Sequence, residues 1–356
     1  MDQYREATAP VTRVEQSTDY YCGAASSVMV FSYFKDTVLQ SDAYGSIREH
    51  MKEPNDWYSD PAGISGCLNA LPSPKSIPFR VDPFASGTLS DIVNKIFYTL
   101  YYLKAPCVSL VYGGLHWVVV DGIRYTEGTS ASRTFLGVYI TDPYNGEPMR
   151  RYIPIDPFQS AYMLPDTFGT LWRQKMVVIS DDTTNLGNLT SGSSAAVFGG
   201  GGVRSPESIA IDGLLLQGFK GLTPVLGGGG PKIGPVEVTS MSDGTKFTLT
   251  FLDARVNSEF GNFICVAVDV ARGSVLEVAS DVSAIHVLDD NAAQRLLWDR
   301  FHGRAVVVLP GQFWQLTPKT RSRFSLIRKL RIDGVQHYLF PDGEVMEYLP
   351  TFMKGG

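Results

Sequence analysis

The stretch QSTDYYCGAASSVMVFSYF, residues 16–34, decides the fold. From Cys22 onward it is apolar on nearly every face, with only small serines interspersed, which predicts a helix buried on all sides. Cys22 stands at the first turn of this helix, where unpaired backbone N–H groups favour a thiolate over a thiol. The N–H of Cys22 and the side chain of Gln16 are donors that could hold an oxyanion. The stretch therefore predicts a cysteine that attacks carbonyl groups.

The rest of the first half reads as helices followed by strands. A short helix is expected near 62–71 and a longer one over 88–103, where Ala105-Pro106 follows and stops it. Runs of β-branched and aromatic residues, separated by Gly, Asp and Asn, then indicate an antiparallel sheet. These runs are 107–112, 116–123, 133–142, 149–155 and 175–180. Helices first and strands afterwards predict an α+β domain.

The second half has a different composition. Residues 183–204 are rich in Gly, Ser, Thr and Asn, which is typical of a linker. Beyond them the chain is mostly strand-like, with one helix expected over 289–301 and hairpin signals at Asp333-Gly334 and Asp342-Gly343. The sequence thus predicts a first domain over 1–182, a linker over 183–204 and a β-rich domain over 205–356.

A nucleophilic thiol needs a base, and the base needs an orienting partner. His116 is the best of five histidines, because it begins a hydrophobic strand directly after Gly113-Gly114 and is expected to face a cleft. Asp142, at the end of the next strand, offers a carboxylate that would fix the imidazole tautomer, although it could also simply start a turn. Asp121 is five positions from His116 on an alternating strand, so it faces the opposite side.

These segments together resemble a known family. Gln16, the Tyr-Cys22-Gly-Ala-Ala stretch, the Leu-His116-Trp strand start and the Asp142-Pro-Tyr turn resemble papain-like cysteine peptidases. They look closest to the branch of double-glycine leader peptidases that process bacteriocin precursors. The resemblance implies a papain-like domain in which the buried helix with Cys22 packs on the antiparallel sheet. It also implies that Gln16 supports the oxyanion, Cys22 attacks, His116 acts as base and then acid, and Asp142 orients the ring.

The resemblance covers about residues 10–180, and the sequence departs from the leader peptidases in two places. The interval between His116 and Asp142 carries an extra polar stretch, 126–133, which we expect to form a long hairpin loop. Residues 205–356 match nothing in those enzymes, and their membrane transporter segments have no counterpart in this sequence. The glycine clusters at 199–202, 227–230 and 355–356 raise self-cleavage as a possibility, with a flexible linker and tail as the simpler interpretation.

The composition of the chain narrows the range of expected binding partners and of expected cellular compartments. The net charge of −5 disfavours a nucleic-acid partner, and no apolar run is long enough for a membrane span. The start has no stretch like a signal peptide, which predicts a cytoplasmic location and leaves signal-independent export open. The four cysteines are too few and too dispersed for a disulfide framework or a zinc site. They are Cys22, Cys67, Cys107 and Cys265. We therefore expect no metal and no cofactor.

Three functions remain open on sequence alone. The first is a thiol-dependent peptidase or amide hydrolase that acts on a protein or peptide through an acyl-enzyme. The second is transglutaminase-type or deamidase-type acyl transfer by the same residues. The third is a binding module that keeps the papain-like fold without catalysis, with 205–356 as a recognition domain. In the enzyme readings 205–356 would recognise substrate, target the enzyme or regulate access to the site.

Overall fold

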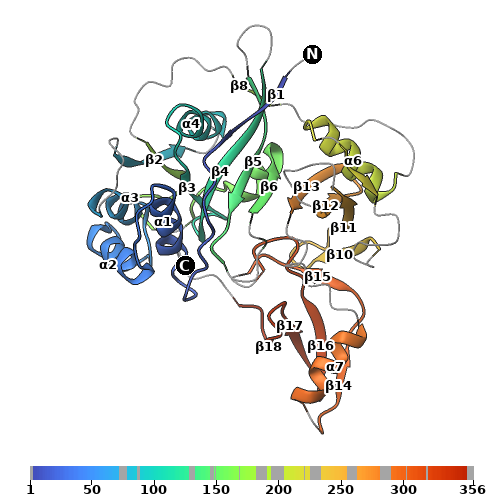
Figure 1. Cartoon of the computed structure of the whole chain (residues 1–356). Coiled ribbons are helices and arrows are strands. Elements are labelled where there is room, and N and C mark those ends of the chain that lie inside the picture. The colour runs from blue at the N-terminus through green and yellow to red at the C-terminus, as the bar shows by residue number, and fades with distance from the viewer. Residues whose placement is uncertain are drawn as a thin grey trace. The chain divides into compact units, whose positions relative to one another are not determined.

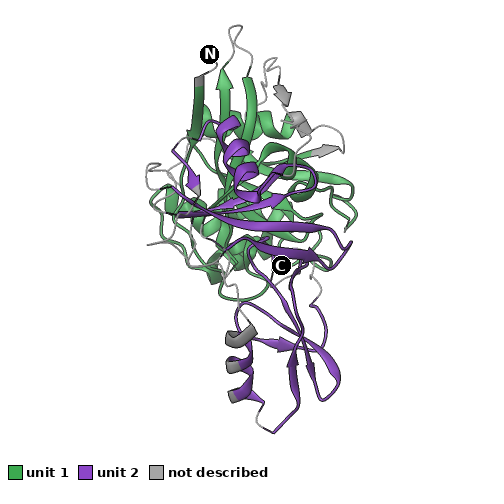
Figure 2. Ribbon diagram, turned by 90° about the vertical axis from the view of Figure 1, so that its right-hand side faces the viewer, with its two compact units in different colours: residues 1–145, 149–195, 352–356 green, residues 146–148, 196–351 purple. Residues whose placement is uncertain are grey.

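The computed structural model has a mixed α+β architecture with a large sheet and few helices. It divides into two compact units, which Figure 2 distinguishes by colour. Unit 1 comprises residues 1–145, 149–195 and 352–356, and unit 2 comprises 146–148 and 196–351. The structure describes residues 3–71, 78–85, 89–127, 133–144, 148, 150–167, 169–181, 191–193, 204–219, 221–224, 234–254, 263–280, 290–301, 303–317 and 320–350.

Unit 1 begins with a strand, and its helices and remaining strands follow (Figure 1). Its helices are α1 (Cys22–Tyr33), α2 (Gln40–His50), α3 (Pro61–Ala70), α4 (Leu89–Tyr101), the single turn α5 (Ile155–Pro157) and the π-helical turn η1 (Phe158–Tyr162). Its strands are β1 (Gln3–Thr8), β2 (Phe79–Ala85), β3 (Cys107–Val111), β4 (His116–Glu127), β5 (Arg133–Thr141), β6 (Arg150–Pro154), β7 (Lys175–Asp181) and β8 (Ser191–Ser193).

The sheet of unit 1 is built around β4. Its strand order is β6-β5-β4-β3-β7-β2, and every neighbouring pair in this order is antiparallel. The first half of β4 pairs with β3, and its second half pairs with β1 along the same edge. Because β4 starts at His116 and β5 ends at Thr141, adjacent to Asp142, the register brings these two strand ends together.

The helices of unit 1 cover both faces of this sheet. In Figure 1, α1, α2 and α3 lie together, and α4 lies apart from them. Trp117 and Val119 of β4 belong to the core beneath α1, whereas the ring of Tyr125 packs edge-on against Phe97 of α4. The bulge at Asp121, between Val120 and Gly122, reverses the alternation of side chains along β4, so the two groups point to opposite faces. Helix α1 is buried over almost its whole length, as its composition predicts.

The small residues of α1 allow it to pack closely against α3 and the segment before it. A Cβ added at Gly23 would lie 2.7 Å from Cβ of Ser59 and 3.0 Å from Cδ1 of Ile64. We therefore expect Gly23→Ala to lower the free energy of unfolding by about 1–3 kcal/mol. Gly45, in α2, has nothing within 4 Å of the added Cβ, so Gly45→Ala should raise stability by about 0.5–1 kcal/mol. Urea titration of both variants measures this, and equal effects would contradict close packing at Gly23.

Unit 2 is rich in strands and contains two sheets. The larger has the order β15-β10-β11-β12-β13, with β9 beside the end of β11, and the smaller has the order β14-β16-β17-β18. Its strands are β9 (Thr223–Pro224), β10 (Val236–Ser240), β11 (Lys246–Asp253), β12 (Phe263–Asp269), β13 (Ser274–Ala279), β14 (Val306–Val308), β15 (Gln312–Trp314), β16 (Arg328–Ile332), β17 (Val335–Leu339) and β18 (Val345–Met346). Helix α6 (Pro206–Leu216) packs on the larger sheet, and α7 (Asp290–Arg300) on the smaller one.

The structure contains most of the elements predicted for the first half of the chain, but some other predictions fall on residues that it does not describe. The helices expected near 22–34, 62–71 and 88–103 and the strands between 107 and 180 are present. Strands β4 and β5 extend to Glu127 and Arg133, so the expected hairpin loop is shorter than 126–133. The linker predicted over 183–204 lies outside the described residues except for 191–193 and 204. The three glycine clusters also lie outside them.

Candidate active site

His116 is the first residue of β4, and the turn before it has an unusual backbone conformation. Tyr112, Gly113 and Gly114 have φ angles of 57°, 69° and 93°, a region that residues with a Cβ seldom adopt. The N–H of Thr167, a residue that is not part of the turn, donates to the carbonyl of Gly113 at 3.2 Å and stabilises the turn. The glycine pair thus lets the chain reverse sharply after β3 and places His116 at the end of the sheet.

The imidazole of His116 is paired with the carboxylate of Asp142. The distance from Nε2 to Oδ1 is 2.8 Å, and both side chains are fully buried. Oδ1 also accepts from the backbone N–H of Tyr144 at 2.9 Å, so Asp142 starts a turn as well. The ring of Tyr112 lies parallel to the imidazole, with ring centroids 6.4 Å apart. One carboxylate therefore fixes both the ring of His116 and the turn after β5.

A buried arginine that our sequence analysis missed completes the surroundings of Asp142. Arg151, in β6, donates from Nη2 to Oδ2 of Asp142 at 2.8 Å, and its side chain is fully buried. The preceding residue, Arg150, places Nε 3.1 Å from both carboxylate oxygens of Asp121. The sequence signal that could have indicated Arg151 is the presence of two consecutive arginines in a predicted strand. The pairing itself requires the register of β6 against β5, which the sequence did not provide.

Asp121 has its own set of partners, on the face of the sheet opposite to His116. Thr141 donates to its Oδ2 at 3.2 Å, beside the Arg150 contact. Burial raises the pKa of the Asp121 carboxyl, and Arg150 opposes that shift. Two buried carboxylates thus lie on opposite faces of the sheet, each paired with an arginine; Arg151 is fully buried and Arg150 is one-third exposed.

The chain that leads into α1 is tied to the turn that carries Asp142. The N–H of Gln16 donates to the carbonyl of Pro143 at 2.8 Å, and Arg13 donates from Nε to the carbonyl of Asp142 at 2.9 Å. The side-chain amide of Gln16 donates to the carbonyl of Thr18 at 2.8 Å. An amide nitrogen carries two hydrogens, so this bond is compatible with a second one to an oxyanion.

Cys22 lies between two anchors of α1. Before it, Gln16 is bonded to Pro143, the residue after Asp142. After it, Ser26 donates from Oγ to the backbone carbonyl of Trp117 at 3.3 Å. Ser26 is one helical turn from Cys22, and Trp117 is the residue after His116. The two residues that accept these bonds, Pro143 and Trp117, are therefore the sequence neighbours of Asp142 and His116.

The start of α1 can stabilise a negative charge, although the residues there are shielded from solvent. Tyr21 is the N-cap residue and makes no capping bond with its side chain, and the first turn carries no acidic residue. Unpaired N–H groups at such a terminus favour negative charge. Cys22 and His116 both have 0% exposure, whereas the sequence suggested a histidine open to a cleft. Access of any reagent to Cys22 consequently requires movement of the residues around it.

Four tyrosines form a cluster of rings that includes the two residues directly before Cys22. Their ring centroids lie 4.6–5.7 Å apart in stacked, tilted and edge-on pairs; they are Tyr20, Tyr21, Tyr44 and Tyr58. Trp117, the residue after His116, belongs to the core and donates from Nε1 to the carbonyl of Ser59 at 3.0 Å.

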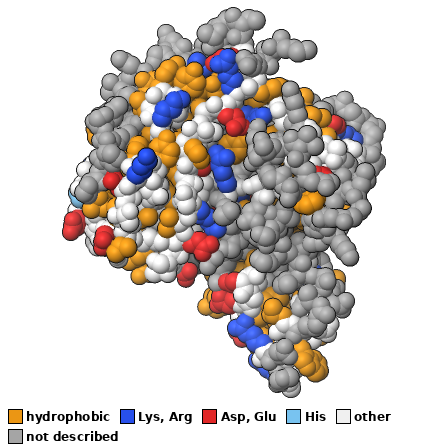
Figure 3. Space-filling view, in the orientation of Figure 1, with side chains coloured by type: hydrophobic (Ala, Val, Ile, Leu, Met, Phe, Trp, Pro, Cys, Tyr) orange, Lys and Arg blue, Asp and Glu red, His pale blue; other side chains and the backbone are white. Residues whose placement is uncertain are grey.

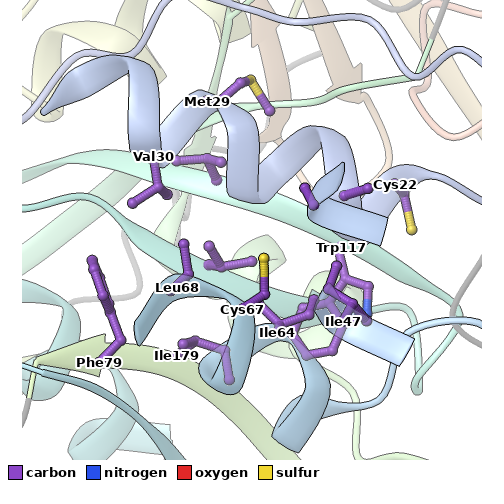
Figure 4. Packing of buried hydrophobic residues seen from close by; sticks show 14 of the residues in the cluster. Cys22, Met29, Val30, Ile47, Ile64, Cys67, Leu68, Phe79, Trp117 and Ile179 are labelled. Carbon is purple, nitrogen blue, oxygen red and sulfur yellow. The ribbon is translucent and has the colours of Figure 1, made fainter. Parts of the chain in front are cut away.

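The other cysteines and histidines show ordinary structural surroundings where they are described. Cys67 lies between α1 and α3 in the middle of the core cluster, while Cys22 lies at the end of α1 (Figure 4). Burial raises the pKa of the Cys67 thiol to about 12, and the pKa of Cys265 well above its usual value. His50 and His337 contact backbone carbonyls of their own segments. His286 and His302 lie outside the described residues.

Three features of the described residues concern possible partners: the surface charge, the length of the helices and the placement of potential metal ligands. Lys and Arg side chains are interspersed with Asp and Glu on the face shown in Figure 3. Over the residues that the structure describes, no helix combines the length and apolar character needed to cross a membrane. Within the same residues, no group of three or more His, Cys, Asp or Glu side chains is placed to hold a metal ion.

Comparison with known proteins finds similarity to a solved structure and to no family model. No family model matches the chain, and no curated protein matches it. A similar solved structure is that of a double glycine motif protease from an AMS/PCAT transporter, in complex with the leader peptide. The alignment covers 50% of this chain and 95% of that chain, at 18% identity and a TM-score of 0.28.

Proposed function

We propose that the chain is a cysteine peptidase or amide hydrolase that forms an acyl-enzyme on Cys22. The observation that carries the proposal is the buried bond between His116 and Asp142, at 2.8 Å, whose two sequence neighbours anchor the helix that begins with Cys22. Thiol catalysis requires a helix-terminal cysteine and, within its reach, a histidine held by a carboxylate, and the two anchors tie the start of α1 to the segments that carry this pair. A papain-like arrangement of 1–182, followed by a β-rich accessory domain over 205–356, belongs to the same proposal.

The chemistry assigns one role to each group. The thiolate of Cys22 attacks the carbonyl carbon, and the oxyanion is held by the N–H of Cys22 and the amide of Gln16. Because Nε2 of His116 is bonded to Asp142, Nδ1 is the nitrogen that exchanges protons with the thiol and then with the leaving amine. Water attacks the thioester with His116 as base, and the acid product leaves.

Thiol labelling tests this assignment without a known substrate. We expect iodoacetamide, at pH about 6 and limiting reagent, to alkylate Cys22 in the wild type, because only an activated thiol is substantially ionised there. Cys22→Ala should lose this label, whereas Cys67→Ala should keep it. Both cysteines are fully buried, so burial alone predicts no difference between them. Equal labelling of the wild type and Cys22→Ala, located by peptide mapping, would refute the proposal.

A peptide library analysed by mass spectrometry then separates the reactions. Cleaved products that are absent with Cys22→Ala would establish a peptidase. Conversion of glutamine to glutamate without cleavage would establish a deamidase. Labelling of Cys22 with neither product would leave the binding module, which also predicts that library peptides bind the wild type and Cys22→Ala equally.

A further inference from the structure

Consecutive arginines in β6 neutralise two different aspartates. In the register of β6 against β5, Arg151 lies opposite Ile140 and Arg150 lies opposite Thr141. Neighbouring residues of a strand point to opposite faces, so the two guanidinium groups diverge. Arg151 reaches Asp142 on the face of His116, and Arg150 reaches Asp121 on the other face.

The carboxylate of Asp142 divides its two oxygens between its partners. Oδ1 accepts from Nε2 of His116 at 2.8 Å and from the N–H of Tyr144 at 2.9 Å, while Oδ2 accepts from Nη2 of Arg151 at 2.8 Å. A carboxylate bonded at one oxygen alone can rotate about its bond to Cβ. The bond to Arg151 fixes the second oxygen and thereby the direction in which Oδ1 faces the imidazole.

Arg151 also brings a permanent charge to a buried site. A guanidinium stays protonated throughout the range in which proteins are folded. It therefore opposes a second positive charge on His116, which lies across the same carboxylate. The attraction of Asp142 for a protonated imidazole is thus opposed in part by a cation bonded to the other oxygen of the same carboxylate. In the low-dielectric interior this opposition is stronger than it would be in water.

We propose that Arg151 is a positioning residue, which aims Asp142 at His116 and sets the pH at which the imidazole gains its proton. The role in catalysis rests on the proposed function, but the effect on His116 does not. Charged or titratable groups around His116 come from five other parts of unit 1. They are Asp142 after β5, Arg151 in β6, Tyr112 in the preceding turn, Asp166 against Gly114, and Arg13 at the carbonyl of Asp142. Cys22 is the sixth, by the proposal above.

The test is an NMR titration of labelled histidine side chains in the full chain with Cys22→Ala. Removal of the thiol leaves the imidazole as the reporter, whether or not the protein is an enzyme. In Arg151→Gln, which keeps a donor for Oδ2 and loses the charge, we expect the titration midpoint of His116 to rise by roughly one pH unit. Arg150→Gln is the matched control, since it removes the same charge from the Asp121 pair, and it should move the midpoint by less than half as much.

Arg151→Lys provides a second measurement that does not depend on Arg151→Gln folding. Lysine keeps the charge, so the midpoint should stay close to that of the parent. In the background with Cys22, its shorter, single-point contact should lower kcat on a cleaved library peptide by several-fold, with KM little changed. An unchanged midpoint in Arg151→Gln, an equal shift in Arg150→Gln, or a full shift in Arg151→Lys would overturn the proposal. Failure to label Cys22 would overturn the proposed function instead.

Discussion

Asp142→Asn is expected to lower kcat/KM by about 10³–10⁴-fold while the fold is kept. All three groups around the carboxylate are donors, because Oδ1 accepts from His116 and Tyr144 and Oδ2 accepts from Arg151. An asparagine must set its NH₂ either against Arg151 or against both His116 and Tyr144. The guanidinium is the strongest donor and takes the amide oxygen, so the NH₂ faces His116. The imidazole then carries its proton on Nδ1 and can no longer accept one from the thiol.

Asp121→Asn is the control for this experiment. Asp121 is also buried and also paired with an arginine, but it lies on the other face of the sheet. We expect it to lose stability and to change kcat/KM by less than tenfold. The assay uses a peptide found in the library screen, and thermal unfolding checks each variant. If both substitutions reduce activity equally, the loss reflects general disturbance of the sheet rather than the tautomer of His116.

Gly114→Ala should destabilise unit 1 by about 2–4 kcal/mol, the sum of two effects. The first is the left-handed backbone, with φ of 93°. The second is steric, because an added Cβ would overlap Oδ1 of Asp166. Since Gly114 lies two residues before His116, relief of the overlap also displaces the imidazole. We therefore expect alkylation of Cys22 at pH about 6 to slow at least tenfold, even where the protein remains folded.

Gly244→Ala separates the two effects. Gly244 has a comparable φ of 72°, but nothing lies within 4 Å of an added Cβ. Its substitution should cost about 1 kcal/mol, which is the backbone strain alone. Urea titration compares the two variants, and labelling of Cys22 should be normal in Gly244→Ala. A cost for Gly114→Ala no larger than that for Gly244→Ala would show that the turn before β4 accommodates a side chain.

The sequence predicted those elements whose burial is visible in local composition. Helix α1 is apolar all round and β3 to β7 are rich in β-branched and aromatic residues, so their types could be assigned. Helix α2 was missed because QSDAYGSIREH is mostly polar and has a glycine at its centre. Strand β2 was missed because it contains Pro83, which is tolerated since β2 lies at the edge of the sheet.

The candidate site was predictable only where its residues stand next to elements that are visible in the local sequence. His116 and Asp142 could be selected because each stands at an end of a hydrophobic strand, and their 2.8 Å contact is present. Arg151 could not, since its role depends on which strand lies beside β5 and in which register. The complete burial of Cys22 was also beyond the sequence, because it depends on how separate segments pack into the core that contains it. The catalytic roles of Gln16, Cys22, His116 and Asp142 stay predictions.

The pairing of β1 with the second half of β4 has a consequence for how the chain acquires its structure. Gln3 pairs with Glu127, so β1 has no partner in β4 until that later strand has been made. Contacts this distant in sequence form slowly, because a long loop must close before they are gained. Until then the edge of β4 from Gly122 to Glu127 presents unpaired backbone groups, which invite pairing with other chains. Aggregation during refolding should therefore depend on protein concentration, and it should increase when β1 is weakened.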